Sequence, residues 1–263
     1  MIEAGLGLYA IAIPAAMLAL MSVTEWLRPR RDLVLGRYPR WLTHALFFLT
    51  NAVVGRILSM VVVVGSAAAW ADAYNFGLFN QTVWPWWAEA LLAFILLDLA
   101  VWAQHLAMHR SGFLWAMHKV HHSDRDLDAT TALRFHPFEL IVSTLFKSAC
   151  VALLGVPVMV ALAFELWLNC NALFNHSNIR LPRQMDRIIR TILVTPDMHL
   201  VHHSTNVAEQ NRNYGFALTW WDRLFGTYAD ESAMGRDHQA IGLAEAMDNR
   251  PAYYLWSMKL PVT

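Results

Sequence analysis

Three long apolar stretches dominate the first 110 residues of the chain. They occupy residues 6–26, 42–70 and 86–108. About 20 apolar residues in a helix cross the roughly 30 Å hydrocarbon core of a bilayer. Each stretch therefore predicts a membrane-spanning helix.

A fourth apolar region, residues 138–174, differs because it is interrupted near Pro157. Proline disfavours helix continuation, since it lacks an N–H donor and its ring clashes with the preceding turn. We therefore expect two short helices that form a hairpin and bring the chain back to the side it left. Whether this hairpin crosses the membrane fully or dips partway stays open at this point.

The loops between these stretches differ in charge. Five arginines follow the first stretch, whereas residues 71–85 contain no lysine or arginine. Positively charged loops stay in the cytosol, so the third stretch should run inward and end at the cytosolic face. The first stretch lacks the basic start and small-residue cleavage site of a signal peptide and is expected to remain as an anchor.

Composition supports a membrane protein. Hydrophobic residues make up 57% of the chain and charged residues only 15%, against roughly 45–50% and 25% in soluble domains. Twenty basic residues balance twenty acidic residues, so no overall field would recruit nucleic acid. The length of 263 residues suits one domain.

Histidines give the clearest chemical signal. Eight of the twelve lie in three short clusters beside apolar segments, one H-x-x-x-H and two H-x-x-H-H runs. Residues three or four apart share a helix face, so each cluster could direct two or three imidazoles to one point. Eight imidazoles exceed the four ligands of a tetrahedral zinc, and imidazole also suits iron, copper and nickel. The pattern predicts two metal ions whose ligands are His105, His109, His118, His121, His122, His199, His202 and His203.

The remaining histidines are less clustered. His136 and His176 flank the hairpin, and spacing alone leaves their role open. His44 and His238 stand alone and are expected to be ordinary side chains, because isolated histidines rarely mark sites.

Two acidic residues are candidates for orienting ligand imidazoles. Asp98 lies inside an apolar span, which by default marks a functional position, and it precedes His105 by about two helical turns. Asp197 lies just before the last cluster. A carboxylate can hold the ring nitrogen of a ligand histidine that faces away from the metal. Pairing with another helix is the alternative for Asp98.

The expected fold is an all-α integral membrane protein with about three spanning helices, a helical hairpin and a cytosolic helical cap that carries the histidine-rich dimetal site. One domain covers residues 1–263, with anchor helices in about 6–108 and 138–174. The metal-binding cap takes residues 105–137 and 175–230, including a possible amphipathic segment at 185–194. Residues 231–263 carry no clear pattern.

At these motifs the chain resembles the fatty acid hydroxylase and sterol desaturase superfamily of membrane non-haem diiron enzymes. The resemblance covers about residues 90–230. It rests on Asp98, His105-Leu-Ala-Met-His109, Leu114-Trp115-Ala-Met-His118-Lys-Val-His121-His122-Ser123, Arg134-Phe-His136-Pro, Asn175-His176-Ser-Asn, Asp197-Met-His199-Leu-Val-His202-His203-Ser204, Asn213-Tyr214-Gly215-Phe216 and the segment from Trp220 to Tyr228.

The resemblance implies that His136 and His176 are also ligands, which makes ten. It further implies two iron ions, which zinc could replace in a purified sample. The implied reaction uses O2 to hydroxylate, or to desaturate, an unactivated C–H of a lipid such as a fatty acyl chain or sterol. No haem, Rossmann or iron–sulfur pattern is evident, so electrons would come from a separate reductase, ferredoxin or cytochrome. The bacterial inner membrane is the expected location.

Two other classes of function fit the sequence less well. A zinc-dependent membrane hydrolase needs fewer histidines and usually a carboxylate base, and no H-E-x-x-H is present. A metal transporter would place ionisable ligands deep within several spans, where only Asp98 and Glu165 are candidates. The identity of the lipid is not legible in the sequence.

Overall fold

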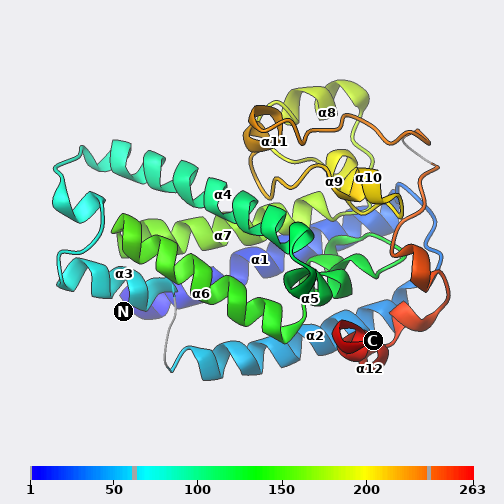
Figure 1. Ribbon diagram of the computed structural model, residues 1–263, viewed down its shortest axis with the longest axis horizontal. Helices are drawn as coiled ribbons and strands as arrows, with labels where there is room; N and C mark the ends of the chain where they lie inside the picture. Colours follow the sequence, from blue (N-terminus) through cyan, green and yellow to red (C-terminus); the bar gives the residue numbers. More distant parts are fainter. Residues whose placement is uncertain (1, 61–63, 236–237) are drawn as a thin grey trace.

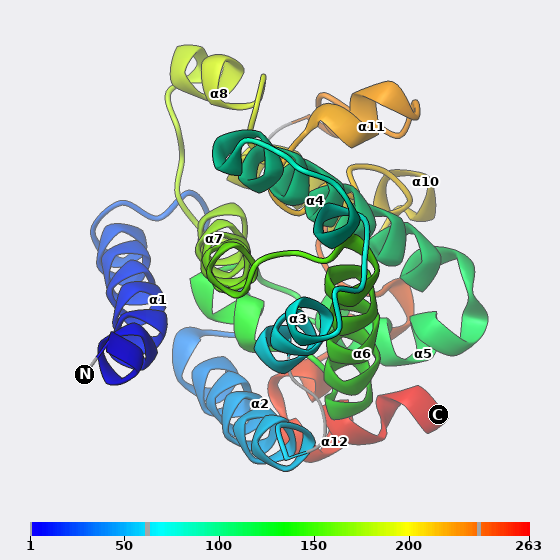
Figure 2. The same cartoon turned by 90° about the vertical axis from the view of Figure 1, so that its left-hand side faces the viewer.

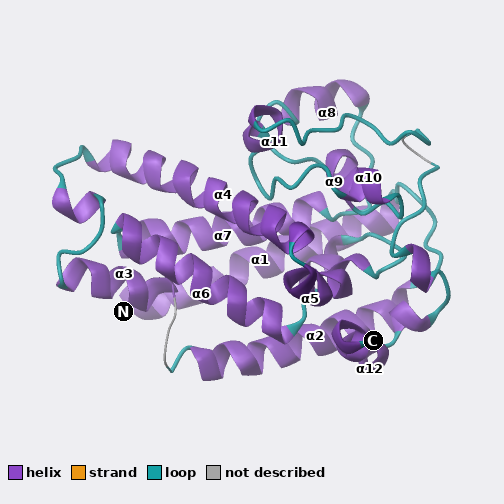
Figure 3. Cartoon of the chain, in the orientation of Figure 1, coloured by secondary structure: helices purple, strands orange, loops and turns teal. Residues whose placement is uncertain are grey.

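The computed structural model describes residues 2–60, 64–235 and 238–263. Within these ranges the regular elements are helices, with isolated β-bridges but no strand. Long helices run along the longest axis of the molecule, and short helices gather at one end (Figures 1 and 3). The predicted all-α fold is confirmed.

The long helices form the anchor. Seen from the end opposite the short helices, they lie side by side as a bundle (Figure 2). Four of them, α2, α4, α6 and α7, are long and apolar enough to cross a membrane. The elements are α1 (Ile2–Leu27), α2 (Arg37–Leu58), α3 (Val64–Ala73), α4 (Trp86–Arg110), α6 (Pro137–Leu154) and α7 (Val158–Asn175).

The second apolar stretch differs from its prediction. We expected one helix over residues 42–70, but α2 ends at Leu58 and α3 begins at Val64; residues 61–63 lie outside the described ranges. The described residues that follow α2, Ser59 and Met60, form a turn instead of continuing the helix. The second half then packs separately as α3 against α6 and α7.

The predicted hairpin at residues 138–174 is confirmed as α6 and α7. Gly155 ends α6 with a φ of 70°, in the left-handed region, which glycine adopts without steric cost. A Cβ at this position would lie 2.9 Å from the carbonyl oxygen of Phe76, so a larger residue would not fit. Pro157 then caps the start of α7.

Short helices build the cap around the C-terminal ends of α4 and α7 (Figure 1). The segment predicted as amphipathic at 185–194 is partly helical, with Ile188 exposed and Asp186 buried. The cap elements are α5 (Gly112–His122), η2 (Ala129–Leu133), α8 (Arg183–Ile189), α9 (Pro196–His202), α10 (Val207–Gln210) and α11 (Trp220–Leu224).

The C-terminal tail, for which the sequence made no prediction, closes the cap on the anchor. It contains η3 (Ala244–Ala246), η4 (Arg250–Ala252), α12 (Tyr254–Lys259) and η5 (Leu260–Val262). Leu260 and Leu243 pack in one cluster with Phe47 of α2 and Val120 of α5. The tail therefore helps to fix the position of α5.

A buried ionic cluster joins the anchor to the segment after α5. Arg40 of α2 is fully buried and donates to both carboxylate oxygens of Asp124, each at 2.8 Å, and to Asp128 at 2.5 Å. Burial opposes ionisation of Asp124, but Arg40 holds the pKa of this carboxyl well below its usual range. Paired charges of this kind tolerate burial, and they fix where α5 ends relative to α2.

Candidate metal centre

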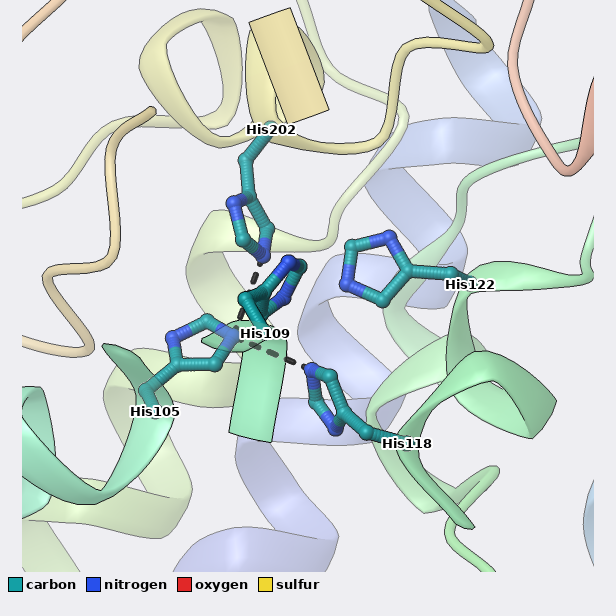
Figure 4. Close-up of side chains that lie close together, drawn as sticks. All are labelled: His105, His109, His118, His122 and His202. Atoms are coloured by element: carbon teal, nitrogen blue, oxygen red, sulfur yellow. Dashed lines mark hydrogen bonds between the residues drawn. The ribbon is translucent and has the colours of Figure 1, made fainter. Parts of the chain in front are cut away.

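Nine of the ten predicted ligands meet in the cap as two adjacent groups. The ligand nitrogens of each group lie within 4.8 Å of one another. The first group, shown in Figure 4, draws residues from α4, α5 and α9 and consists of His105, His109, His118, His122 and His202. The second group consists of His121, His176, His199 and His203.

Each H-x-x-H-H motif serves both groups. On α5, His118 and His122 face the first group, whereas His121 faces the second. On α9 the arrangement is reversed, because His202 alone joins the first group. The expectation that each motif serves a single point is therefore wrong: positions i and i+4 share a face, but position i+3 here points to the neighbouring group. The two groups touch where the rings of His122 and His203 stack, 4.4 Å apart.

The hydrogen bonds at the outer ring nitrogens define the tautomers. The Nδ1 of His105 donates to the carbonyl of Tyr214 at 2.8 Å, and that of His202 donates to the carbonyl of Arg212 at 2.7 Å. A neutral imidazole that carries its proton on Nδ1 has a lone pair on Nε2. These two Nε2 atoms lie 3.0 Å apart, so two lone pairs face each other.

The second group is built in the same way. The Nδ1 of His176 donates to the carbonyl of Ala172 at 2.7 Å, and its Nε2 lies 3.0 Å from those of His121 and His199. Burial lowers the pKa of His176 to about 4 and that of His202 to about 3. His176 and His202 are therefore neutral at physiological pH.

This donor set fits metal ions. Lone pairs that converge at 3.0 Å repel one another unless a cation lies between them, and neutral imidazole is the commonest metal ligand. Five imidazoles in the first group exceed the four ligands of a tetrahedral zinc site, and imidazole also suits iron, copper and nickel. Further buried ring nitrogens have no hydrogen-bond partner among the described residues, including Nε2 of His109 and both nitrogens of His122.

His136, the tenth predicted ligand, is not brought to either group. It caps the start of α6, where its Nδ1 accepts a hydrogen bond from the backbone N–H of Phe138 at 3.3 Å. The two isolated histidines agree with their expectation: His44 is buried between Thr130 and Asp124, and His238 is exposed.

The two predicted orienting acids contact other groups. Asp98 accepts from the indole N–H of Trp221 at 2.8 Å and from the backbone N–H of Leu218 at 3.3 Å, so it attaches α4 to the cap. The role that we assigned to it beside His105 is filled by the Tyr214 carbonyl. Asp197 forms a buried ion pair with Arg30, which links α9 to the arginine loop.

Sequence reasoning missed Glu139, the acid that does contact a ligand. Its Oε1 accepts from Nδ1 of His118 at 2.7 Å, and its side chain is buried. A signal was available, since Glu139 lies in the first turn of the helix that begins after His136-Pro137. We also missed how Asp222 acts: it accepts from the N–H groups of Tyr214 and Gly215 and so holds the carbonyl that binds His105.

A cavity of about 170 Å³ reaches the first group from among the long helices. His105 and His118 are among its lining residues, together with apolar side chains such as Leu140, Leu168 and Phe216.

Residues 90–227 match the family described as Fatty acid hydroxylase. This match covers more than half of the chain and includes every histidine of both groups. The chain belongs to the fatty acid hydroxylase family. No solved structure matches it.

The names of relatives that the chain matches refer to different lipids. The alkylglycerol monooxygenase of Homo sapiens is 26% identical over 82% of the chain and 46% of its own length. The ornithine lipid hydroxylase OlsE of Rhizobium tropici is 32% identical over 65% of the chain and 50% of its own length. The cholesterol 25-hydroxylase of Homo sapiens is 27% identical over 56% of the chain and 53% of its own length. The chain thus spans about half the length of the curated relatives it matches.

Proposed function

We propose that this membrane protein is an O2-dependent lipid hydroxylase whose nine clustered histidines hold two iron ions. One observation carries the proposal: imidazoles gather in two adjacent groups, and within each group ring nitrogens face one another at 3.0 Å. The arginine-rich loop beside the cap supports a cytosolic location of this centre by the positive-inside rule. The bacterial inner membrane is the proposed location.

The overall reaction replaces a C–H bond of the lipid by C–OH. One oxygen atom of O2 enters the product and the other leaves as water, which consumes two electrons and two protons. When bound, the iron ions would supply the reductive activation of O2. The electrons would come from a separate donor, a reductase, ferredoxin or cytochrome.

The residues of the chain itself prepare the site. Glu139 and the carbonyls of Ala172, Arg212 and Tyr214 hold the outer ring nitrogens and so orient the imidazoles; such contacts raise ligand basicity and fix the ring. Apolar walls of the cavity exclude water from the path of the hydrocarbon.

Hydroxylation is favoured over desaturation by the relatives, whose names describe monooxygenases and hydroxylases. The same names support a lipid as substrate. Neither alternative, a zinc hydrolase or a metal transporter, explains nine imidazoles collected at one end of the helices.

Metal analysis of protein purified without oxygen tests this function. We expect two irons per chain and incorporation of label from 18O2 into a lipid. His121→Ala and His202→Ala should each abolish this turnover while membrane insertion persists, and His238→Ala, an exposed histidine, should retain it. One zinc and no iron, with no turnover after iron is added, would refute the proposal.

A further inference from the structure

A second cavity reaches the first group of histidines from the cap. Its volume is about 240 Å³, and His109 is one of its lining residues. Val207 and Gln210 of α10 also line it, and α10 lies at the end of the molecule where the short helices gather (Figure 1). We call it the cap-side cavity, and the cavity beside His105 and His118 the bundle-side cavity.

His109 is the point where the cap-side cavity meets the centre. Of the nine grouped histidines, eight are buried and His109 is partly exposed. Its Nε2 is buried and has no hydrogen-bond partner among the described residues. The outer nitrogens of His105 and His202 contact backbone carbonyls, whereas the ring of His109 borders the cavity.

The cap-side cavity has the polarity and the size to hold water. Hydroxyl, amide and carboxylate groups belong to its lining, from Thr205, Gln210, Asn211 and Glu245. A buried water needs roughly 10–15 Å³ and a few polar partners, so a cavity of about 240 Å³ has room for several. Ala244 and Glu245 are exposed, so the cavity opens at the surface of the cap.

The two cavities reach different members of the same group. The bundle-side cavity has His105 and His118 in its lining, with apolar side chains such as Leu140, and the cap-side cavity has His109. The four histidines of the second group line neither of these two cavities. A metal in the first group therefore has a route toward solvent that is separate from the long helices.

We propose that the cap-side cavity is the aqueous entrance of the metal centre, through which water and small hydrophilic ligands reach the first group beside His109. Trp115 narrows this entrance, since it lines the cavity and its ring lies 4.9 Å from that of His109. Hydroxylation consumes two protons and releases one water, and this use of the entrance rests on the proposed function. The entry of small ligands does not.

Azide binding to the full chain, loaded with Co(II) in nanodiscs, tests this inference. The absorption of Co(II) reports a small anion that reaches the metal, without iron, O2 or turnover. Ala244→Trp and Val207→Trp each place a large ring in the lining of the cap-side cavity at an exposed position. An obstructed entrance slows association and dissociation alike. We expect both rate constants to fall about 10-fold, with an unchanged dissociation constant and unchanged Co(II) content.

Ala208→Trp is the matched control, because it places the same ring at an exposed position of α10 outside the lining of the cavity. It should keep the wild-type rates, as should Leu140→Trp in the bundle-side cavity. Absence of azide binding, wild-type rates in both cap-side variants, or slower association in Leu140→Trp alone would overturn the inference. Slowed azide entry in a chain that oxidises no lipid refutes only the function. Lipid oxidation with unaltered azide rates in both cap-side variants refutes only the inference.

Discussion

Single residues around the centre act by holding imidazoles rather than by touching a substrate. The clearest case is Glu139, whose Oε1 accepts a hydrogen bond from Nδ1 of His118. Partners of this type change metal affinity by about 10- to 100-fold when they are altered. Glu139 therefore supports the metal site through His118, although it is not itself one of the grouped residues.

We expect Glu139→Gln to weaken iron retention, because a neutral amide holds the His118 N–H less strongly than a carboxylate. The loss should be about 10-fold or more in the chelator concentration that removes half of the iron. Glu231→Gln, an exposed glutamate of the cap, serves as control. Wild-type retention in Glu139→Gln would show that the contact does not support the metal.

Gly215 follows Tyr214, whose carbonyl accepts a hydrogen bond from a second ligand, His105. A Cβ here would lie 2.7 Å from the carbonyl of Leu218 and 2.8 Å from Oδ2 of Asp222, so the backbone that presents the Tyr214 carbonyl to His105 must move. We expect Gly215→Ala to destabilise the protein by about 1–3 kcal/mol and to reduce iron content. Gly112→Ala, where a Cβ meets nothing within 4 Å, should leave both unchanged. Equal iron content and thermal stability in the two variants would contradict this view.

At the scale of elements, the centre depends on how α2, α5 and the tail are fixed to one another. Arg40 binds the carboxylates that follow α5. Arg134 donates to Ser123 at the end of α5 and to Ser257 of α12. The helix that supplies three ligands is thereby held from both sides.

Arg40→Met should therefore disturb the centre from a distance. It leaves Asp124 and Asp128 buried without their cation, and breaking a buried pair typically costs about 3–5 kcal/mol. Thermal unfolding in detergent, together with iron content, measures the effect. Arg37→Met should cost far less, because the hydrogen bond that the Arg37 guanidinium makes among the described residues goes to the backbone carbonyl of Glu25, at 3.2 Å. A small effect at Arg40 would mean that the ionic cluster does not position α5.

For the whole molecule, metal binding and folding should be linked, because the nine imidazoles come from α4, α5, α7 and α9 and meet only in the folded chain. We expect chelation to lower the midpoint of thermal unfolding and Fe(II) to restore it. Free metal at about 1,000 times its dissociation constant stabilises the folded state over the unfolded state by about 4 kcal/mol per site. His121→Ala with His202→Ala should abolish the restoration, and an unchanged midpoint on chelation of the wild type would contradict the linkage.

Much of this architecture was predictable where the signal is local. The spans at residues 86–108 and 138–174 follow from runs of apolar residues and from the break at Pro157, and α4, α6 and α7 match them closely. The prediction for the second span was wrong because length and apolarity do not reveal that α2 ends at Leu58, with a turn at Ser59 and Met60. His136 was expected as a ligand from the family pattern, yet its place at the start of α6 depends on how that helix packs.

The sequence by itself determined the membrane helices, the hairpin and the set of histidines, because hydrophobic length and helical spacing are properties of neighbouring residues. Tertiary structure alone decided that each H-x-x-H-H motif divides between two groups and that Glu139 rather than Asp98 holds a ligand. These outcomes depend on the relative orientation of α4, α5, α6, α7 and α9, which is set by contacts between residues far apart in the chain.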